Sequence, residues 1–223
     1  MAQDDFTRPY LVVVEGPGDA EFFRHLIRCR GLAAKFHVRC PRDADGVSGG
    51  GNTRFRQALD AFGVIPGFDD LEAVIVATDA DDDPTVAFAN AQQQIRSTAK
   101  GLVAPAAPLV EGSGRPRVSV MVVPWVGEPG NLETLCAVAA AAAFPREADC
   151  ADQFEACTGV AEWPVAKRSK VRLRSIISSA YQRNPDLSLA RLWREDPGLV
   201  PLDHECFDRI AKYLGSFANS AGD

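Results

Sequence analysis

The sequence predicts an α/β fold: a mainly parallel, Rossmann-like sheet flanked by helices, with a helical C-terminal extension. Short β-branched runs alternate with segments of helical periodicity, which is typical of a parallel sheet covered on both faces. After Pro145 the strand signal disappears and only helical patterns follow. We therefore expect an α/β core over residues 8–135 and a helical extension packed on it over residues 136–220.

The first half of the core contains two predicted strands, each followed by a helix. YLVVVEG (10–16) is a short apolar run that predicts a buried strand, and DAEFFRHLIRCRG (19–31) then shows helical spacing. KFHVRC (35–40) alternates polar and apolar residues, so it predicts a half-exposed strand. The glycine-rich stretch DGVSGGGN (45–52) predicts a loop, and TRFRQALDAFG (53–63) a second helix.

Two more strand and helix pairs complete the predicted core. VIVATDADDDP (74–84) begins as a buried strand, and a helix is expected over residues 85–100. A loop of flexible composition leads to RVSVMVVPW (117–125), the third apolar strand, and GNLETLCAVAAAAAF (130–144) is its helix. In the extension, two helical faces are expected, one at Leu173, Ile176, Ile177, Ala180 and Tyr181 and one at Phe207, Ile210, Ala211 and Leu214.

Composition limits the possible partners. The formal net charge is −6, so a site for a polyanion has to be local. The start MAQDDFTRPY lacks the features of a signal peptide, and the run AVAAAAAF is far shorter than the roughly 20 residues of a membrane helix. Six cysteines without metal-finger spacing predict reduced, small core residues. We expect a cytoplasmic protein with no membrane partner.

Acidic residues follow the first, the middle and the last long strand: Glu15; Asp79, Asp81 and Asp83; and Glu128 and Glu133. Ligands of such sheets bind outside the carboxyl ends of the strands, so these acids are expected to converge. Converging carboxylates raise each other's pKa, and a divalent cation removes that cost. Because the ligands are oxygen atoms only, Mg²⁺ or Mn²⁺ is expected rather than zinc.

The run of aspartates is compatible with more than one kind of site. An EF-hand loop from Asp79 is excluded, because Pro84 and Asn90 stand where glycine and glutamate are required. An aspartyl-phosphate phosphatase stays open, although its usual glycine turn is missing. A solvated, acidic helix N-terminus also stays open. It explains one or two aspartates, but not three at alternate positions that point the same way.

The loop in VVVEGPGDAE also has several interpretations. It lacks the third glycine of a dinucleotide fingerprint, and the chain has no GKS or GKT of a P-loop. What remains is Glu15, held at a strand tip by a tight turn, with Asp19 one helical turn later. Asp19 is either a helix cap or a metal ligand.

These two strand ends resemble the Toprim domain of topoisomerases, primases, repair proteins and OLD-family nucleases. VVVEGPGDAEFF is similar to its first motif and VIVATDADDD to its second, in the same order and about 60 residues apart. The chain also resembles small stand-alone Toprim-like bacterial proteins, through GNLETL and the basic helix KRSKVRLRSII. The core resemblance covers roughly residues 8–135 and implies a Toprim-like fold.

The resemblance implies roles for individual residues. Glu15 is the expected general acid/base or metal ligand, and Asp79 and Asp81 are expected to hold Mg²⁺. In OLD-type nucleases an acid one turn later, a late acid and a late lysine complete a two-metal site, which Asp19, Glu133 and either Lys167 or Lys170 match. OLD nucleases also carry an ATPase that this chain lacks, so a partner subunit such as an ATPase is expected.

The stretch KRSKVRLR (167–174) holds five cations and no acid. It is either the solvated face of a helix or a contact for a DNA or RNA backbone, with Arg168, Arg172 and Arg174 as the expected contacts. The glycine run SGGG (48–51) either cradles a phosphate or forms a mobile loop.

Together these features predict a Mg²⁺-dependent Toprim-type nuclease, whose role in phage defence or DNA repair is implied by the resemblance alone. The alternatives are a non-catalytic module that binds nucleic acid or a partner, and a small phosphatase or phosphotransfer enzyme.

Overall fold

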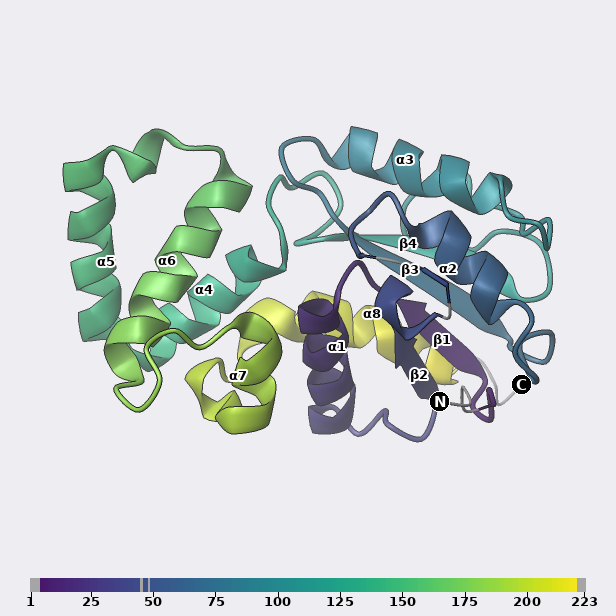
Figure 1. Ribbon diagram of the computed structural model, residues 1–223, viewed down its shortest axis with the longest axis horizontal. Helices are drawn as coiled ribbons and strands as arrows, with labels where there is room; N and C mark the ends of the chain where they lie inside the picture. Colours follow the sequence, from purple (N-terminus) through teal and green to yellow (C-terminus); the bar gives the residue numbers. More distant parts are fainter. Residues whose placement is uncertain (1–4, 45, 48, 220–223) are drawn as a thin grey trace.

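The fold is α/β, with a four-stranded, all-parallel sheet between layers of helices (Figure 1). The strands β1 (Tyr10–Val13), β2 (Phe36–Arg39), β3 (Ala73–Asp79) and β4 (Arg117–Val123) lie in the order β2-β1-β3-β4. The predicted fold class is therefore confirmed, and the sheet is consistent with a Rossmann-like fold. The computed structural model describes residues 5–44, 46–47 and 49–219.

The order of the strands reverses direction between β1 and β3. Helix α1 (Pro17–Cys29) leads from β1 to β2 on one side, and α2 (Phe55–Phe62) leads back across to β3. Helix α3 (Pro84–Arg96) then leads to β4. Ligands of open parallel sheets bind at such a reversal, outside the carboxyl ends of the strands. The end of β1 and the end of β3 are therefore the place to look for a site.

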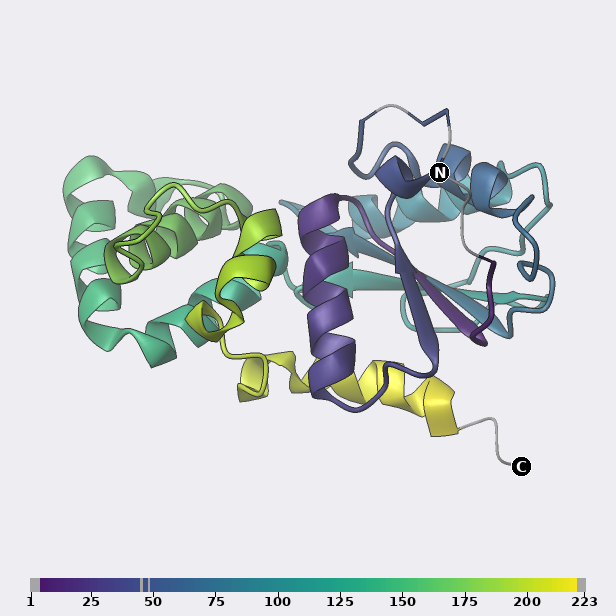
Figure 2. The ribbon, with the colours of Figure 1, turned by 60° about the horizontal axis from the view of Figure 1, so that its bottom comes forward.

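Alternate residues of β1, β3 and β4 enter two separate cores, whereas β2 contributes only to the first. Tyr10 and Val12 of β1 pack in the core that contains residues of α1 and of the last helix, α8 (Asp208–Asn219), whereas Leu11 and Val13 pack with α2 and α3. Figure 2 shows α8 on the side of the sheet opposite to α2 and α3. Because both faces are covered, β1 is apolar throughout and fully buried.

The predicted C-terminal extension consists of helices and ends on the sheet. Its longer helices before α8 are α4 (Leu132–Ala143), α5 (Pro145–Thr158), α6 (Val165–Ala180) and α7 (Leu189–Glu195). The short 3₁₀ turns of the chain are η1 (Pro41–Asp43), η2 (Val160–Glu162), η3 (Pro197–Leu199) and η4 (Glu205–Phe207). Helices α4, α5 and α6 form a group beside the sheet (Figure 1).

Helix α8 returns to the core. The Tyr10 hydroxyl donates a hydrogen bond to the Phe217 carbonyl at 2.7 Å, and the hydroxyls of Tyr213 and Ser119 lie 2.5 Å apart. The predicted boundary after residue 135 falls inside α4, and the predicted end at residue 220 lies outside the described residues. The extension is thus a helical group followed by a helix that covers the sheet.

The six cysteines are free, as expected, but their burial differs from the prediction. Cys40 and Cys136 are buried and Cys206 is half-buried. Cys29, Cys150 and Cys157 are exposed, so the expectation of core positions is wrong for these three. Their helices turn other residues toward the core, and a cysteine's own polarity does not decide which face it occupies.

The longest described helix, α6, has 16 residues and carries the five cations of KRSKVRLR. The alanine-rich helix α4 has only 12 residues. Among the residues that the structure describes, no helix has both the length and the apolar composition needed to cross a membrane.

Candidate functional site

Glu15 lies just beyond β1 and is fixed against the end of β3. Its Oε1 accepts a hydrogen bond from the Thr78 hydroxyl at 2.7 Å and another from the Asp79 backbone N–H at 2.9 Å. Burial raises the pKa of Glu15 and the charge of Asp81 adds to this, while the two hydrogen bonds and Lys170 oppose it. Thr78 was not selected by any sequence pattern, because only the pairing of strands brings it to Glu15.

Asp79 is the last residue of β3, and its Oδ1 accepts a hydrogen bond from the Leu132 backbone N–H at 3.0 Å. This bond joins the end of β3 to the first turn of α4. Burial raises the pKa of Asp79 well above its usual value, and the charges of Glu15, Asp19 and Glu133 raise it further. Asp79 therefore lies close to other acidic side chains, at the point where the strand order reverses.

Asp19 stands at the third position of α1, after Gly16 as the N-cap residue, and its metal role stays a prediction. Its Oδ2 accepts a hydrogen bond from the Gly16 backbone N–H at 2.9 Å, so it helps to cap the start of α1. Burial raises its pKa to about 7, and the charges of Glu15 and Glu133 contribute. Asp19 therefore holds the turn and also faces the other acids.

Glu133 approaches the same acids from α4. It is half-buried, and its charge raises the pKa of both Asp19 and Asp79. The start of α4 is fixed by the buried Asn131, whose Oδ1 accepts from the Thr134 N–H and whose side-chain nitrogen donates to the Ala166 carbonyl of α6. We call Glu15, Asp19, Asp79 and Glu133 the acidic centre.

Asp83 is turned away to cap α3, whereas Asp81 stays close enough for its charge to raise the pKa of Glu15. The strand stops at Asp79, and Asp81 turns with φ 48° while its carbonyl accepts from the Gly130 N–H at 2.7 Å. The Asp83 Oδ1 caps α3 by accepting from the N–H groups of Thr85 and Val86 at 2.8 and 3.1 Å. The expectation that the three aspartates point the same way is therefore wrong, because the extended backbone does not continue. A metal role for Asp81 or Asp83 stays a prediction.

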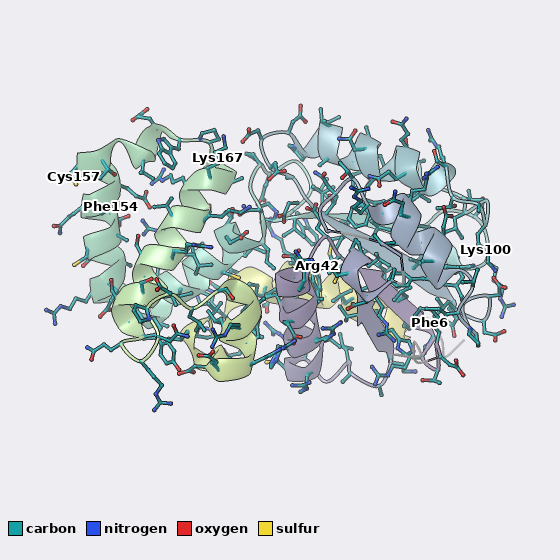
Figure 3. The ribbon with its side chains drawn as sticks, in the orientation of Figure 1. Phe6, Arg42, Lys100, Phe154, Cys157 and Lys167 are labelled. Atoms are coloured by element: carbon teal, nitrogen blue, oxygen red, sulfur yellow. The ribbon has the colours of Figure 1, made fainter. Side chains whose placement is uncertain are left out.

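Of the two candidate lysines, Lys170 is the one with an electrostatic link to the acids. It is exposed on α6, and its charge lowers the pKa of both Glu15 and Asp19. It also lines a hollow of about 70 Å³ together with Glu133 and Arg174. Lys167 is exposed one turn earlier, near the start of α6 (Figure 3).

Two of the three candidate arginines of α6 form ion pairs with α5. Arg168 Nε lies 2.5 Å from Glu155 Oε2, and Arg172 pairs with Asp152 and with Glu155. Glu155 is only 1% exposed, so this pairing lies between the two helices. Arg174 is exposed. KRSKVRLR has no acid of its own, but α5 supplies two, which the local sequence could not indicate. Its contacts to a nucleic-acid backbone stay a prediction.

The glycine run lies against Glu15. The Gly51 N–H donates to the Glu15 carbonyl at 2.9 Å, and a Cβ on Gly50 would stand 3.0 Å from that same oxygen. Gly51 also has φ +99°, a conformation that favours glycine. Ser48 lies outside the described residues. The run is therefore packed at the tip of β1, and its role toward a phosphate stays a prediction.

The oxygen atoms of the acidic centre suit a small, hard cation. Among the described residues no group of three or more His, Cys, Asp and Glu side chains is already arranged as a metal cluster. Glu15, Asp19 and Asp79 are instead oriented by protein donors around a cavity of about 10 Å³, the space of about one water molecule. Hard carboxylate oxygens suit Mg²⁺ or Mn²⁺, and opposite charge would lower pKa values that burial and repulsion have raised. The residues therefore fit such an ion.

The comparisons with known proteins identify a family but no activity. A family model described as a protein of unknown function (DUF3226) matches residues 9–219. This range includes the whole sheet, the acidic centre and most of the C-terminal extension. No curated protein and no solved structure matches the chain.

Proposed function

The chain belongs to the DUF3226 family, whose description states no activity, and from its site we propose that it is a Mg²⁺- or Mn²⁺-dependent, Toprim-type nuclease. Its substrates are the phosphodiester bonds of DNA or RNA. The acidic centre carries this proposal: carboxylates from the end of β1, the end of β3 and the first turns of α1 and α4 share one partly buried place at the reversal of the sheet.

Burial distinguishes the acidic centre from an ordinary charged surface. A solvated acid at a helix N-terminus keeps its charge at little cost, whereas Asp19 and Asp79 are partly buried beside other acids and have raised pKa values. Repulsion of this kind lowers the stability of a fold. Such a centre is favoured where a function needs the negative charge.

In this proposal Glu15, Asp19, Asp79 and Glu133 hold the metal. A divalent ion held there would lower the pKa of a water and would neutralise charge on the phosphate. Glu15, whose pKa is raised by burial, accepts the proton of the attacking water as the water oxygen bonds to phosphorus and the bond from phosphorus to the leaving oxygen breaks; it then returns the proton to the leaving oxygen. Lys170 supplies positive charge next to the phosphate that is cleaved. Thr78 and the Asp79 N–H orient the Glu15 carboxylate through its Oε1.

The proposal is tested by incubating the purified protein with plasmid DNA, single-stranded DNA and RNA in Mg²⁺ or Mn²⁺, with EDTA as the blank. We expect cleavage that depends on metal and that Asp79→Asn reduces by at least about 100-fold. Asp83→Asn is the matched control. It makes the same chemical change outside the acidic centre and keeps a good helix cap, so it should cut as the unchanged protein does.

Three outcomes would overturn the proposal. Cleavage that is unaffected by Asp79→Asn would mean that the acidic centre is not the active site. Binding of DNA or RNA without cutting, with or without an added ATPase partner, would indicate a non-catalytic module. Metal-dependent hydrolysis of p-nitrophenyl phosphate with no cutting of nucleic acid would indicate the phosphatase.

A further inference from the structure

A hollow of about 480 Å³ lies where the edge strand β2 meets α1. Four arginines line it, Arg8, Arg24, Arg28 and Arg39, and within the described part of the chain no acidic side chain joins them in its lining. We call these four residues and the space between them the basic hollow. Because the chain as a whole has a net charge of −6, this positive surface opposes the overall charge of the molecule.

A second hollow of the same size shows that charge, and not volume, distinguishes the basic hollow. It lies beside η4 and α8 and also measures about 480 Å³. It is lined by acids and bases together, namely Glu128, Glu205, Asp208, Arg209 and Lys212. Opposite charges there offset one another, so it offers a polyanion no comparable attraction.

Two guanidinium groups are held along the free edge of β2. Arg8 Nη1 donates to the Phe36 carbonyl at 2.7 Å, and Arg24 Nη2 donates to the Val38 carbonyl at 3.0 Å. Among the described strands β2 pairs only with β1, so these carbonyls lie on its unpaired side. The two bonds place positive charge at fixed points beside the strand.

Local contacts fix the positions of Arg8 and Arg24, and those of Arg24 also reduce its net charge. His37 Nε2 accepts hydrogen bonds from the backbone N–H groups of Thr7 and Arg8, so it anchors the segment that carries Arg8. Arg24 also pairs with Glu21 at 3.1 Å and Asp43 at 3.3 Å, which partly offsets its charge. Arg8 and Arg28 are exposed, and Arg28 stands on α1 one turn after Arg24.

The basic hollow leads toward the acidic centre. Arg39 is in register with Val13 of β1, two residues before Glu15, which places its backbone within about 10 Å of Glu15. Arg42 follows in η1, and in the view of Figure 3 it lies at the N-terminal end of α1, the end that carries Asp19. Positive groups therefore continue from the edge of β2 to the carboxyl ends of the strands.

We propose that the basic hollow binds the phosphate backbone of a nucleic-acid strand and directs it to the acidic centre. Guanidinium groups match phosphate oxygens in geometry and stay charged at all physiological pH values. That the anion is a nucleic acid rests on the proposed function. The proposed binding surface lies on α1 and β2. Arg24 is paired with Glu21 and Asp43, as Arg168 and Arg172 of α6 are paired with acids of α5, so the exposed Arg8 and Arg28 are the main contacts in this proposal.

The test measures binding of a fluorescent single-stranded and a double-stranded oligonucleotide in EDTA, where metal-dependent cutting is absent. Arg28→Gln should weaken binding by about fivefold, as for one exposed charge, and Arg8→Gln with Arg28→Gln by more. Each lost phosphate contact should reduce the log–log salt slope by about 0.7 to 0.9. Melting curves of each variant confirm that the fold is kept.

Arg96→Gln on α3 is the matched control, because it removes the same charge from an exposed position on the other side of the sheet. It should leave affinity and salt slope unchanged. Equal affinities for the Arg28→Gln variant and the unchanged protein would overturn the proposal. The arginines would then serve only to keep the exposed edge of β2 from pairing with another chain. Loss of binding in Arg174→Gln alone would also overturn it in favour of α6. A protein that binds inorganic phosphate but does not bind either oligonucleotide would also overturn the proposal.

The failure of this proposal differs from the failure of the proposed function. If oligonucleotide binding depends on Arg28 but no cutting occurs, the proposed nuclease activity is wrong and the proposed role of the basic hollow stands. If metal-dependent cutting occurs but binding does not change in Arg28→Gln, the proposed nuclease activity stands and the proposed role of the basic hollow is wrong.

Discussion

The acidic centre and helix α6 each hold several charges of one sign, but they differ in whether opposite charges lie beside them. The arginines Arg168 and Arg172 of α6 meet Asp152 and Glu155 of α5, so opposite charges offset one another. In the acidic centre, burial and mutual repulsion raise the pKa of Glu15, Asp19 and Asp79. Two cations of α6 are thus offset by acids of α5, whereas in the acidic centre Lys170 opposes the raised pKa values only in part.

The largest expected effect separates the two regions by activity. Glu15→Gln keeps an oxygen that can accept from Thr78 and from the Asp79 N–H, so the fold should persist. It removes the charge and the proton transfer, and metal-dependent cleavage should fall by at least about 100-fold. Cleavage assays at saturating substrate measure the loss of activity, and melting curves show whether the fold is kept. Unchanged cleavage in a folded variant would remove Glu15 from the mechanism.

The second effect concerns stability in α5 and α6. Glu155→Ala leaves Arg168 and Arg172 without a nearly buried partner and should lower the free energy of unfolding by about 2 kcal/mol. Urea unfolding measures the loss. Asp149→Ala, which removes an exposed acid from the same helix, should stay within about 0.5 kcal/mol of the unchanged protein. Equal losses in both variants would mean that the α5–α6 ion pairs contribute nothing.

The third effect tests the cation that links the two regions. Lys170→Gln should lower the turnover of cleavage at saturating substrate by about tenfold, because an exposed charge stabilises the transition state less than a buried one. Lys167→Gln is the control on the same helix and should have little effect. Lys170→Gln should also raise the pKa of Asp19 further, which titration by NMR detects. If both variants lose the same small factor, α6 plays no part in catalysis.

The fourth effect is the pH dependence of the metal-free protein. The pKa of Asp19 rises from 3.8 to about 7, so between these values the folded state binds more protons than the unfolded state. The contribution of Asp19 to stability is therefore greatest at the acidic side of this window and falls as pH rises through it, by less than about 1.4 kcal/mol per pH unit. Thermal melts in EDTA from about pH 4 to about pH 8 show the slope. Asp19→Asn, which can still accept from the Gly16 N–H, should flatten it.

The effect of added Mg²⁺ on melting should also differ between the acidic centre and the ion pairs of α5 and α6. A bound cation requires ionised carboxylates, so its stabilising effect on melting should be larger at about pH 8 than at about pH 6. The ion pair of Asp152 with Arg172 should not respond, because Arg172 lowers the pKa of Asp152 and keeps this carboxylate ionised at both pH values. Equal stabilisation at both pH values, or none at either, would contradict a metal at the acidic centre.

The architecture and the position of the main acids could be predicted from local patterns of the chain. Unbroken apolar runs such as the one at Tyr10–Val13 can be buried only in a sheet covered on both faces, and alternation with helices makes that sheet parallel. Since the carboxyl ends of parallel strands share one edge, Glu15 and Asp79 are expected to lie together on this ground alone. These inferences depend on periodicity, which is a local property of the chain.

How each charge is compensated depended on the folded chain, because partners far apart in the sequence are not visible in a local pattern. The fold took Asp83 into a helix cap, matched Arg172 with Asp152, and brought Thr78 and the Asp79 N–H to the carboxylate of Glu15. It also gathered Arg8, Arg24, Arg28 and Arg39 from three separate segments at one edge of the sheet. Charge acts through space with a strength set by distance and burial, and both are properties of the tertiary structure.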